Sequence, residues 1–215
     1  MVTGYIDADL RSYGSKILYV GDPGQLEPIE NDIKIMSEPD FILDEIHRQA
    51  RGSDIIDFSF KVRNGMSVFR PTQTKELLIG TRADFWDAAK KADMVIVGFN
   101  KTRHEVNRVL RRHKGFDYFV PEVGEPVICL RNNRDMGVYN GLTAQVIRTR
   151  GTAGDVYYID IEDELGRQWK NLPTYIPQYG SDSLSNTFKD KEILLFDWAY
   201  GLTAHKSQGS EWKKG

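Results

Sequence analysis

Short apolar runs that stop abruptly at a glycine or a capping residue constrain the fold of this chain most strongly. Residues 16–20 (KILYV) lead straight into a glycine-rich turn at 21–24, and residues 93–99 (DMVIVGF) are followed by Asn100 and an amphipathic stretch over 102–113. A continuous apolar run of this length is typical of a strand buried on both faces, as in a parallel sheet. Strand, polar cap and helix follow one another in α/β proteins. The sequence therefore predicts an α/β fold containing a parallel sheet.

The pattern changes after Pro121. Residues 125–175 consist of short alternating runs separated by turns rich in Asn and Gly, which are hairpin signals. They predict a small antiparallel β module. The apolar run 192–197 then predicts a return to a buried strand of the α/β domain, so the module is expected to be inserted into that domain. Two further helices are predicted over 53–64 and 82–91.

The composition limits what the chain can do. With 40% hydrophobic and 28% charged residues, its 215 residues fit a globular protein and exclude collagen-like, low-complexity and disordered classes. No apolar run approaches the ~20 residues that cross a bilayer, so no membrane partner is expected. The single cysteine, Cys129, excludes an internal disulfide and a cysteine-based zinc cluster, and fits a cytoplasmic protein.

The net charge of −2 gives no global positive field, so nucleic-acid binding would need a local patch. Basic residues gather on the predicted helix 102–113 and in the β module, which usually indicates a solvated surface. Together with Tyr139 and Tyr157 they are also compatible with a groove in which bases of a single strand stack on aromatic rings.

The first chemically informative segment is residues 21–29 (GDPGQLEPI). A glycine-rich turn at the carboxyl end of a parallel strand lies where α/β sheets bind ligands. Asp22 and Gln25 place polar groups there, and a glutamine can hydrogen-bond a terminal phosphate or an attacking water without adding negative charge. The alternative interpretation is a β-turn with solvated polar side chains.

The second segment is residues 43–50 (LDEIHRQA). The Arg48 guanidinium is suited to stabilise charge on a transferred phosphoryl group. The alternative is a surface ion pair with Asp44 or Glu45 of little consequence. Asp44 and Glu45 superficially resemble a magnesium-binding pair, but no phosphate-binding loop precedes them, and that interpretation is the weaker one.

The third and most specific segment is residues 199–211 (AYGLTAHKSQGSE). It follows an apolar run directly and concentrates hydrogen-bond donors that suit the phosphate oxygens of a nucleic-acid backbone. Gly209 would allow a ligand to approach the main chain closely. A lone histidine or lysine would more often be structural or solvated, but the density of polar neighbours favours a functional loop.

In this order the three segments resemble motifs of superfamily 1 DNA helicases, and most of all the 5′→3′ branch that contains the exonuclease V alpha subunit and the phage Dda-type helicases. Residues 21–29 are similar to motif III, residues 43–49 to motif IV and residues 203–211 to motif V. Residues 132–141 resemble the opening of the SH3-like insertion of that family.

The resemblance implies a RecA-like parallel-sheet helicase domain 2A with an inserted SH3-like antiparallel β module. The implied parts are the end of RecA-like domain 1A over residues 1–35, domain 2A over 36–120 and 190–215, and the inserted domain 2B over 121–189.

The resemblance also implies roles for individual residues. The implied catalytic residues are Gln25, which would sense the γ-phosphate, and Arg48, which would act as an arginine finger. The implied nucleotide-binding residues are Gly21, Asp22, Gln25, Arg48, Gly209 and Glu211, with Glu211 near the ribose. The implied DNA-binding residues are Asn140, Thr203, His205, Lys206 and Ser207. The implied cofactors are ATP and Mg²⁺, with no metal ligand expected in this chain.

The function implied for the intact enzyme is ATP-driven translocation on single-stranded DNA and 5′→3′ unwinding of duplex, in replication, recombination or repair. Its expected partners are single-stranded DNA, duplex junctions, an upstream helicase domain, and nuclease or replication proteins. The chain departs from the family pattern because it contains no G-x-x-x-x-G-K-[ST] loop and no Asp-Glu motif shortly before residue 16. We therefore expect it to be the C-terminal part of a longer helicase, unable to hydrolyse ATP alone.

Two rival functions remain open at the level of sequence. One is a non-catalytic module that binds single-stranded DNA or protein, such as a helicase remnant. The other is a nucleotidase or P-loop enzyme that uses Asp44 and Glu45.

Overall fold

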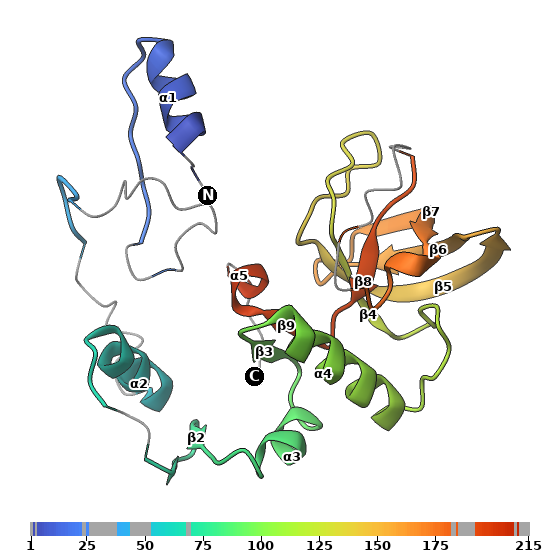
Figure 1. Ribbon diagram of the computed structural model, residues 1–215, viewed down its shortest axis with the longest axis horizontal. Coiled ribbons are helices and arrows are strands. Elements are labelled where there is room, and N and C mark those ends of the chain that lie inside the picture. Colours follow the sequence, from blue (N-terminus) through green and yellow to red (C-terminus); the bar gives the residue numbers. More distant parts are fainter. Residues whose placement is uncertain are drawn as a thin grey trace. The chain divides into compact units, whose positions relative to one another are not determined.

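The chain divides into two compact units, Met1–Ala83 and Asp84–Gly215. They are seen in a computed structural model, shown in Figure 1, and each is described here by itself. The residues that the structure describes are 2, 4–22, 25, 38–43, 53–67, 70–181, 184, 192–208 and 210.

The first unit contains little regular structure in its described part. Its elements are the helices α1 (Gly4–Ser12) and α2 (Asp54–Arg63) and the short antiparallel strands β1 (Thr72–Gln73) and β2 (Leu78–Ile79). The helix predicted over 53–64 is therefore confirmed. None of the described residues in this unit is buried, so those residues form no core of their own.

The strand predicted over residues 16–20 is not formed. That segment is extended, and Leu18 and Val20 are 86% and 87% exposed. A buried parallel strand is hydrogen-bonded to a neighbour at each edge. No strand in the described part of the chain pairs with this segment, which explains why its apolar side chains stay in contact with solvent.

The second unit contains a parallel strand pair covered by a helix. Strand β3 (Val95–Val97) pairs in parallel with β9 (Gly201–Thr203), and α4 (Asn100–His113) packs against both. The helix comes very close to β9, because a Cβ atom built on Gly201 would lie 2.7 Å from Cγ1 of Val106. Only a glycine leaves room for this contact. The short helices α3 (Phe85–Ala89) and α5 (Ala204–Ser207) precede β3 and follow β9.

The β module predicted after Pro121 is present as a five-stranded antiparallel sheet. Its strand order is β7-β6-β5-β4-β8. Its strands are β4 (Pro126–Cys129), β5 (Thr143–Ala153), β6 (Val156–Glu162), β7 (Gln168–Tyr175) and β8 (Phe196–Trp198), with a 3₁₀ turn, η2 (Ile176–Gln178), after β7. The fold is thus a mixed α/β structure that contains parallel strands, as the sequence predicts.

The partner of β8 differs from the expectation. The run 192–197 was expected to return to the parallel sheet, but β8 pairs antiparallel with β4, and the unanticipated strand β9 pairs with β3. Only Ala199 and Tyr200 separate the two strands. Ala199 N–H donates to Pro126 O at 2.9 Å, and Val95 N–H donates to Tyr200 O at 3.3 Å, so both linking residues are tied to the strands beside them.

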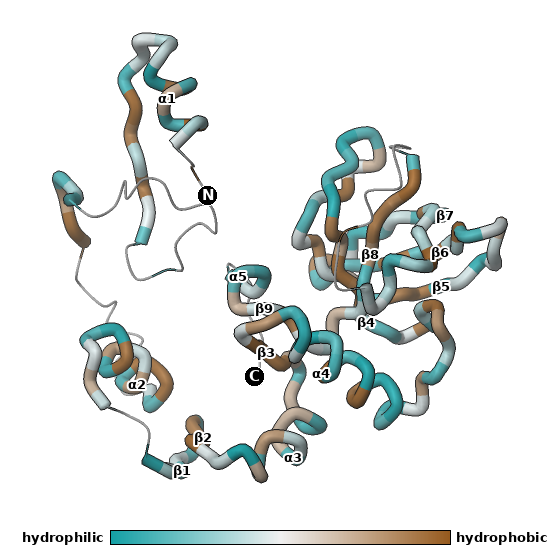
Figure 2. The backbone as a smooth tube through the Cα atoms, viewed as in Figure 1, coloured by the Kyte–Doolittle hydropathy of each residue, from teal (hydrophilic) through white to brown (hydrophobic). Residues whose placement is uncertain are grey.

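A hydrophobic core runs through this unit, beside a second buried cluster that includes Met94, Ile128 and Leu202. It joins Val97 and Val106 of the parallel pair to Ile159, Phe196 and other apolar residues of the antiparallel sheet. Figure 2 shows hydrophobic stretches at β3 and β8 and a largely hydrophilic α4. Tyr157, which the sequence offered as a stacking platform, is only 9% exposed and belongs to this core. That part of the predicted groove is wrong, because the period-two pattern of β6 turns this ring inward.

Candidate nucleic-acid interface

The carboxyl ends of the parallel strands β3 and β9 bring the polar loop of the third segment to one edge. Val97 and Thr203 are register partners at the ends of their strands. Helix α4 begins at Asn100, and α5 follows β9 without a linker. Ligands of α/β proteins bind at this edge. Four of the predicted DNA-binding residues therefore lie together at this edge: Thr203, His205, Lys206 and Ser207. Thr203 is buried and the other three are half-buried.

Lys206 occupies an unusual environment for a lysine. Burial lowers its pKa from the model-compound value of 10.5, and the nearby Arg103 guanidinium lowers that pKa further. The carboxylate of Asp197 acts in the opposite direction. A half-buried ammonium facing another cation is poorly compensated by the protein, so an anionic ligand at this edge would be favourable for it.

The Arg103–Asp197 ion pair lies beneath this loop. Arg103 Nη1 donates to Asp197 Oδ2 at 2.5 Å, and the two side chains are 4% and 0% exposed. The other carboxylate oxygen, Oδ1, accepts from the backbone N–H groups of Trp198 and Gly180, both at 2.8 Å. One buried carboxylate thus joins α4, strand β8 and the segment that leaves the β module.

A second buried pair fixes the far half of α4. Arg111 donates to both oxygens of Glu125, at 2.6 and 2.8 Å, and its guanidinium lies 3.9 Å from the ring centre of Trp198. Tyr200 also donates to Glu125, at 3.0 Å. Asn107 donates to Trp198 O and accepts from Gly201 N–H, at 2.9 and 2.8 Å. These contacts hold α4 against both strands that carry the loop.

Asn140, the remaining predicted DNA-binding residue, lies in an exposed turn of the β module. Its backbone N–H donates to Asn132 Oδ1 at 2.7 Å, and the N–H of Gly141 donates to Cys129 O at 2.9 Å. Burial raises the pKa of the Cys129 thiol to about 11, so this cysteine stays protonated and acts as an apolar residue. The turn therefore presents the Asn140 side chain to solvent on an anchored backbone.

The predicted nucleotide residues Gly21, Asp22 and Gln25 lie in the first unit and are exposed. The Gln25 N–H donates to Asp22 O at 3.1 Å, which forms the turn that the sequence predicts. The Asp22 carboxylate accepts a hydrogen bond from Arg63 of α2. The other predicted nucleotide residues, Arg48, Gly209 and Glu211, lie outside the described residues, as do Asp44 and Glu45.

The described residues do not assemble a site for ATP and Mg²⁺. They contain no group of three or more His, Cys, Asp or Glu side chains that could hold a metal ion, and only three of the six predicted nucleotide residues are among them. In the same described part, no helix has both the length and the apolar character to cross a bilayer.

The sequence reasoning missed Asp197, Arg103 and the Arg111–Glu125 pair. A signal was present, because Asp197 interrupts the apolar run of residues 193–198, and an acidic residue inside a buried strand is rarely left without a partner. The identity of the partner had no local signal, since 94 positions separate Arg103 from Asp197.

Comparison with solved structures finds similarity to a helicase from Bacteroides. A crystal structure of Pif1 helicase in complex with ADP-AlF3 and ssDNA shares 17% identity over 77% of this chain and 42% of its own, with a TM-score of 0.44. A crystal structure of Bacteroides Pif1 bound to ssDNA shares 17% identity over 74% of this chain and 41% of its own, with a TM-score of 0.39. A structure concerned with unwinding of forked dsDNA by two coordinating Pif1 helicases shares 19% identity, over 61% of this chain and 35% of its own, with a TM-score of 0.37.

The chain thus spans about two fifths of the length of these Pif1 structures. No protein-family model and no curated protein matches the sequence.

Proposed function

We propose that this chain supplies the second RecA-like domain, with an inserted SH3-like β module, to a superfamily 1 helicase that uses ATP and Mg²⁺ to translocate 5′→3′ on single-stranded DNA. The observation that carries the proposal is the loop Thr203–Ser207 at the carboxyl edge of the parallel pair β3–β9. The sequence of that loop resembles helicase motif V.

The chemistry of the loop supports a phosphate ligand. Lys206 is a cation whose burial and neighbouring Arg103 disfavour its charged form, so an added phosphate would restore the balance. His205 and Thr203 supply further donors at the same edge. The Ser207 hydroxyl donates to Ala204 O at 2.9 Å, and its oxygen retains acceptor capacity. In this proposal these side chains hold the backbone of the strand, without reading its sequence.

The supporting scaffold is suited to transmit motion. The Arg103–Asp197 pair links α4 to β8 and to the segment leaving the β module. Asn107 of α4 accepts a hydrogen bond from the Gly201 N–H of β9, the strand that leads into the loop. In the intact enzyme, a closure that displaces α4 would therefore displace the loop that holds the strand. Coupling of closure to displacement is what a translocating enzyme requires.

The direct test is fluorescence anisotropy with the chain and a labelled oligothymidylate over a range of salt concentrations. We expect Lys206→Ala to weaken binding and to reduce the salt slope by about 0.7, the value for one lost phosphate contact on a single strand. Lys170→Ala, an exposed lysine on β7, is the matched control. Equal affinities and slopes for the two variants would contradict the proposal.

A second candidate is a module that binds single-stranded DNA or protein without catalysis. It needs only the side chains at the carboxyl edge of β9, Thr203 to Ser207, and none of the predicted nucleotide residues. Adding ATP and Mg²⁺ to the same binding assay separates the two functions. A change in affinity that disappears in Gln25→Ala and Arg48→Ala would support the helicase, and affinity independent of ATP would support the non-catalytic module.

A further inference from the structure

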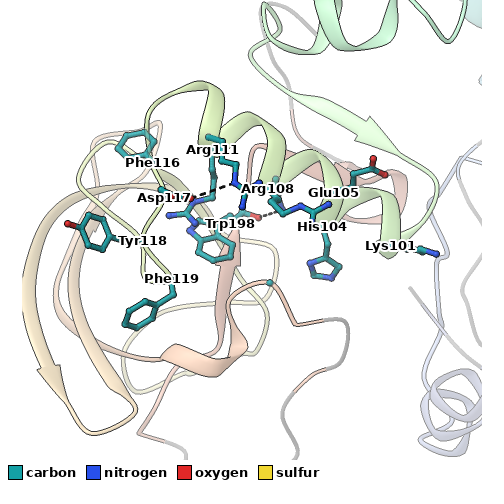
Figure 3. A pocket seen from close by; sticks show the side chains of 13 residues that line it. Lys101, His104, Glu105, Arg108, Arg111, Phe116, Asp117, Tyr118, Phe119 and Trp198 are labelled. Atoms are coloured by element: carbon teal, nitrogen blue, oxygen red, sulfur yellow. Dashed lines mark hydrogen bonds and ion pairs between the residues drawn. The ribbon is translucent and has the colours of Figure 1, made fainter.

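A pocket of about 640 Å³ lies along the exposed side of α4, apart from the motif V loop. It is formed by α4, by the loop that follows the helix and by Trp198 of β8. None of the predicted DNA-binding residues lines it. In Figure 3, Lys101 lies at one end of the pocket and the aromatic side chains of Phe116, Tyr118 and Phe119 lie at the other. The volume is ample for a nucleobase and its sugar.

One wall of the pocket is a stripe of cations on α4. Lys101, Arg108 and Arg112 are exposed, and their spacing of seven and four residues places them on one face of the helix. The stripe extends over about 16 Å of the helix axis. Arg112 lies 3.6 Å from Asp117, but both side chains are well exposed. Such a surface pair contributes little stability, so a phosphate can displace the carboxylate at small cost.

The opposite end carries two neighbouring aromatic rings that packing does not require. Tyr118 and Phe119 are 66% and 70% exposed. Contiguous exposed apolar surface often marks a binding site. Stacking with a nucleobase would cover these rings, and every base offers a π face for it.

Trp198 forms the floor of the pocket, and its ring packs against Arg111. Trp198 is 9% exposed, and its indole Nε1 makes no hydrogen bond with the described residues. Arg111 lies over the ring at 3.9 Å and is itself held by Glu125. Arg111 therefore positions the indole and is not available for a phosphate.

We propose that this pocket is a second binding site for single-stranded nucleic acid, in which a base stacks on Tyr118 and Phe119 while neighbouring phosphates contact Lys101 and Arg108. This second site rests on the proposed function, the binding of single-stranded DNA, but it uses a different surface of the protein. Glu105 and Asp117 also line it, which limits its positive charge. Stacking is therefore the larger contribution to affinity, and the site differs in this respect from the phosphate-binding loop at α5.

The test compares an oligothymidylate of about twenty nucleotides with an abasic oligonucleotide of the same length. The abasic strand keeps the phosphates and lacks the bases. We expect Tyr118→Ala/Phe119→Ala to lower affinity for the oligothymidylate about tenfold or more and to leave abasic affinity unchanged. Lys101→Ala/Arg108→Ala should weaken both ligands and reduce the salt slope by about 1.4. Exposed residues outside the pocket provide the controls Leu165→Ala and Lys90→Ala/Lys91→Ala.

Several outcomes would contradict the proposed binding site. If the aromatic variant binds oligothymidylate normally while Lys206→Ala does not, the pocket is refuted and the proposed function stands. If the aromatic variant weakens both oligonucleotides equally, base stacking is refuted. If the Lys101→Ala/Arg108→Ala variant loses binding to a polyglutamate peptide but keeps its affinity for the oligothymidylate, the pocket would be assigned to an acidic partner instead. If the unmodified chain binds no oligonucleotide, the pocket and the proposed function both fail.

Discussion

The buried Arg103–Asp197 pair provides the sharpest test of how this unit is held together. Asp197→Asn preserves the shape of the side chain and the acceptor for the backbone N–H groups of Trp198 and Gly180. It removes the negative charge facing Arg103, which is 4% exposed. The guanidinium is then left buried without a counter-charge. Breaking a buried pair in this way costs about 3–5 kcal/mol.

That cost is a large share of the ~5–15 kcal/mol by which a domain is stable. With a urea m-value of about 2 kcal/mol/M, the unfolding midpoint should fall by about 1.5–2.5 M. Tryptophan fluorescence is a suitable signal, because Trp198 is the next residue in the strand. Arg103→Met should also destabilise the unit, by a smaller amount, since Asp197 keeps two backbone donors.

The double variant Asp197→Asn/Arg103→Met tests whether the two side chains are energetically coupled. Once both charges are gone, no buried ion lacks a partner, so the double variant should be more stable than Asp197→Asn alone. Destabilisations that simply add in the double variant would refute the coupling. A midpoint for Asp197→Asn within about 0.3 M of the unmodified chain, less than about 1 kcal/mol at that m-value, would refute the inferred cost of the unpaired charge.

Four further outcomes follow from single residues. Gly201→Ala should lower stability by about 1–3 kcal/mol in thermal unfolding, since its Cβ would meet Val106 at 2.7 Å, and a Val106→Ala background should reduce that loss. The pKa of Asp160 is lowered from 3.8, first by its hydrogen bond with an arginine of β5. Its stabilisation is therefore complete above pH 3.8 and lost as pH falls through the lower folded-state value, so the urea midpoints of Asp160→Asn and the unmodified chain should converge in acid. Because the pKa of Lys206 is lowered from 10.5, oligonucleotide affinity should fall as pH rises, starting below 10.5, and Lys206→Arg should abolish that dependence. The unmodified chain and Arg48→Ala should both show no magnesium-dependent ATP hydrolysis. A measurable rate in the unmodified chain that Arg48→Ala abolishes would contradict this expectation.

Elements that depend on local pattern could be predicted from the sequence. The apolar run and helical period of residues 94–113 predicted β3 and α4, and alternation predicted the antiparallel module. The expected helix 82–91 shortens to α3, Phe85–Ala89. The partner of β8 was mistaken, because an apolar run suits a buried strand of either sheet. Pairing between distant segments has no local signal.

The candidate site divides in the same way. The polar residues of α5 were predicted from their density and from their position after a strand. The buried ion pair near Lys206 was not predicted, because Arg103 and Asp197 are 94 positions apart and meet only through the fold. The pocket beside α4 was missed for the same reason. Its cations were visible as a basic helix, but Trp198 comes from a distant strand.

The direct passage from β8 to β9 has a mechanical consequence. Ala199 and Tyr200 span at most about 7 Å of chain, and each is hydrogen-bonded to a neighbouring strand, one in either sheet. The connection between the sheets is therefore short and anchored on both sides. A rotation of the antiparallel sheet would be passed to the strand that ends at Thr203, and so to the residues of α5 that follow it.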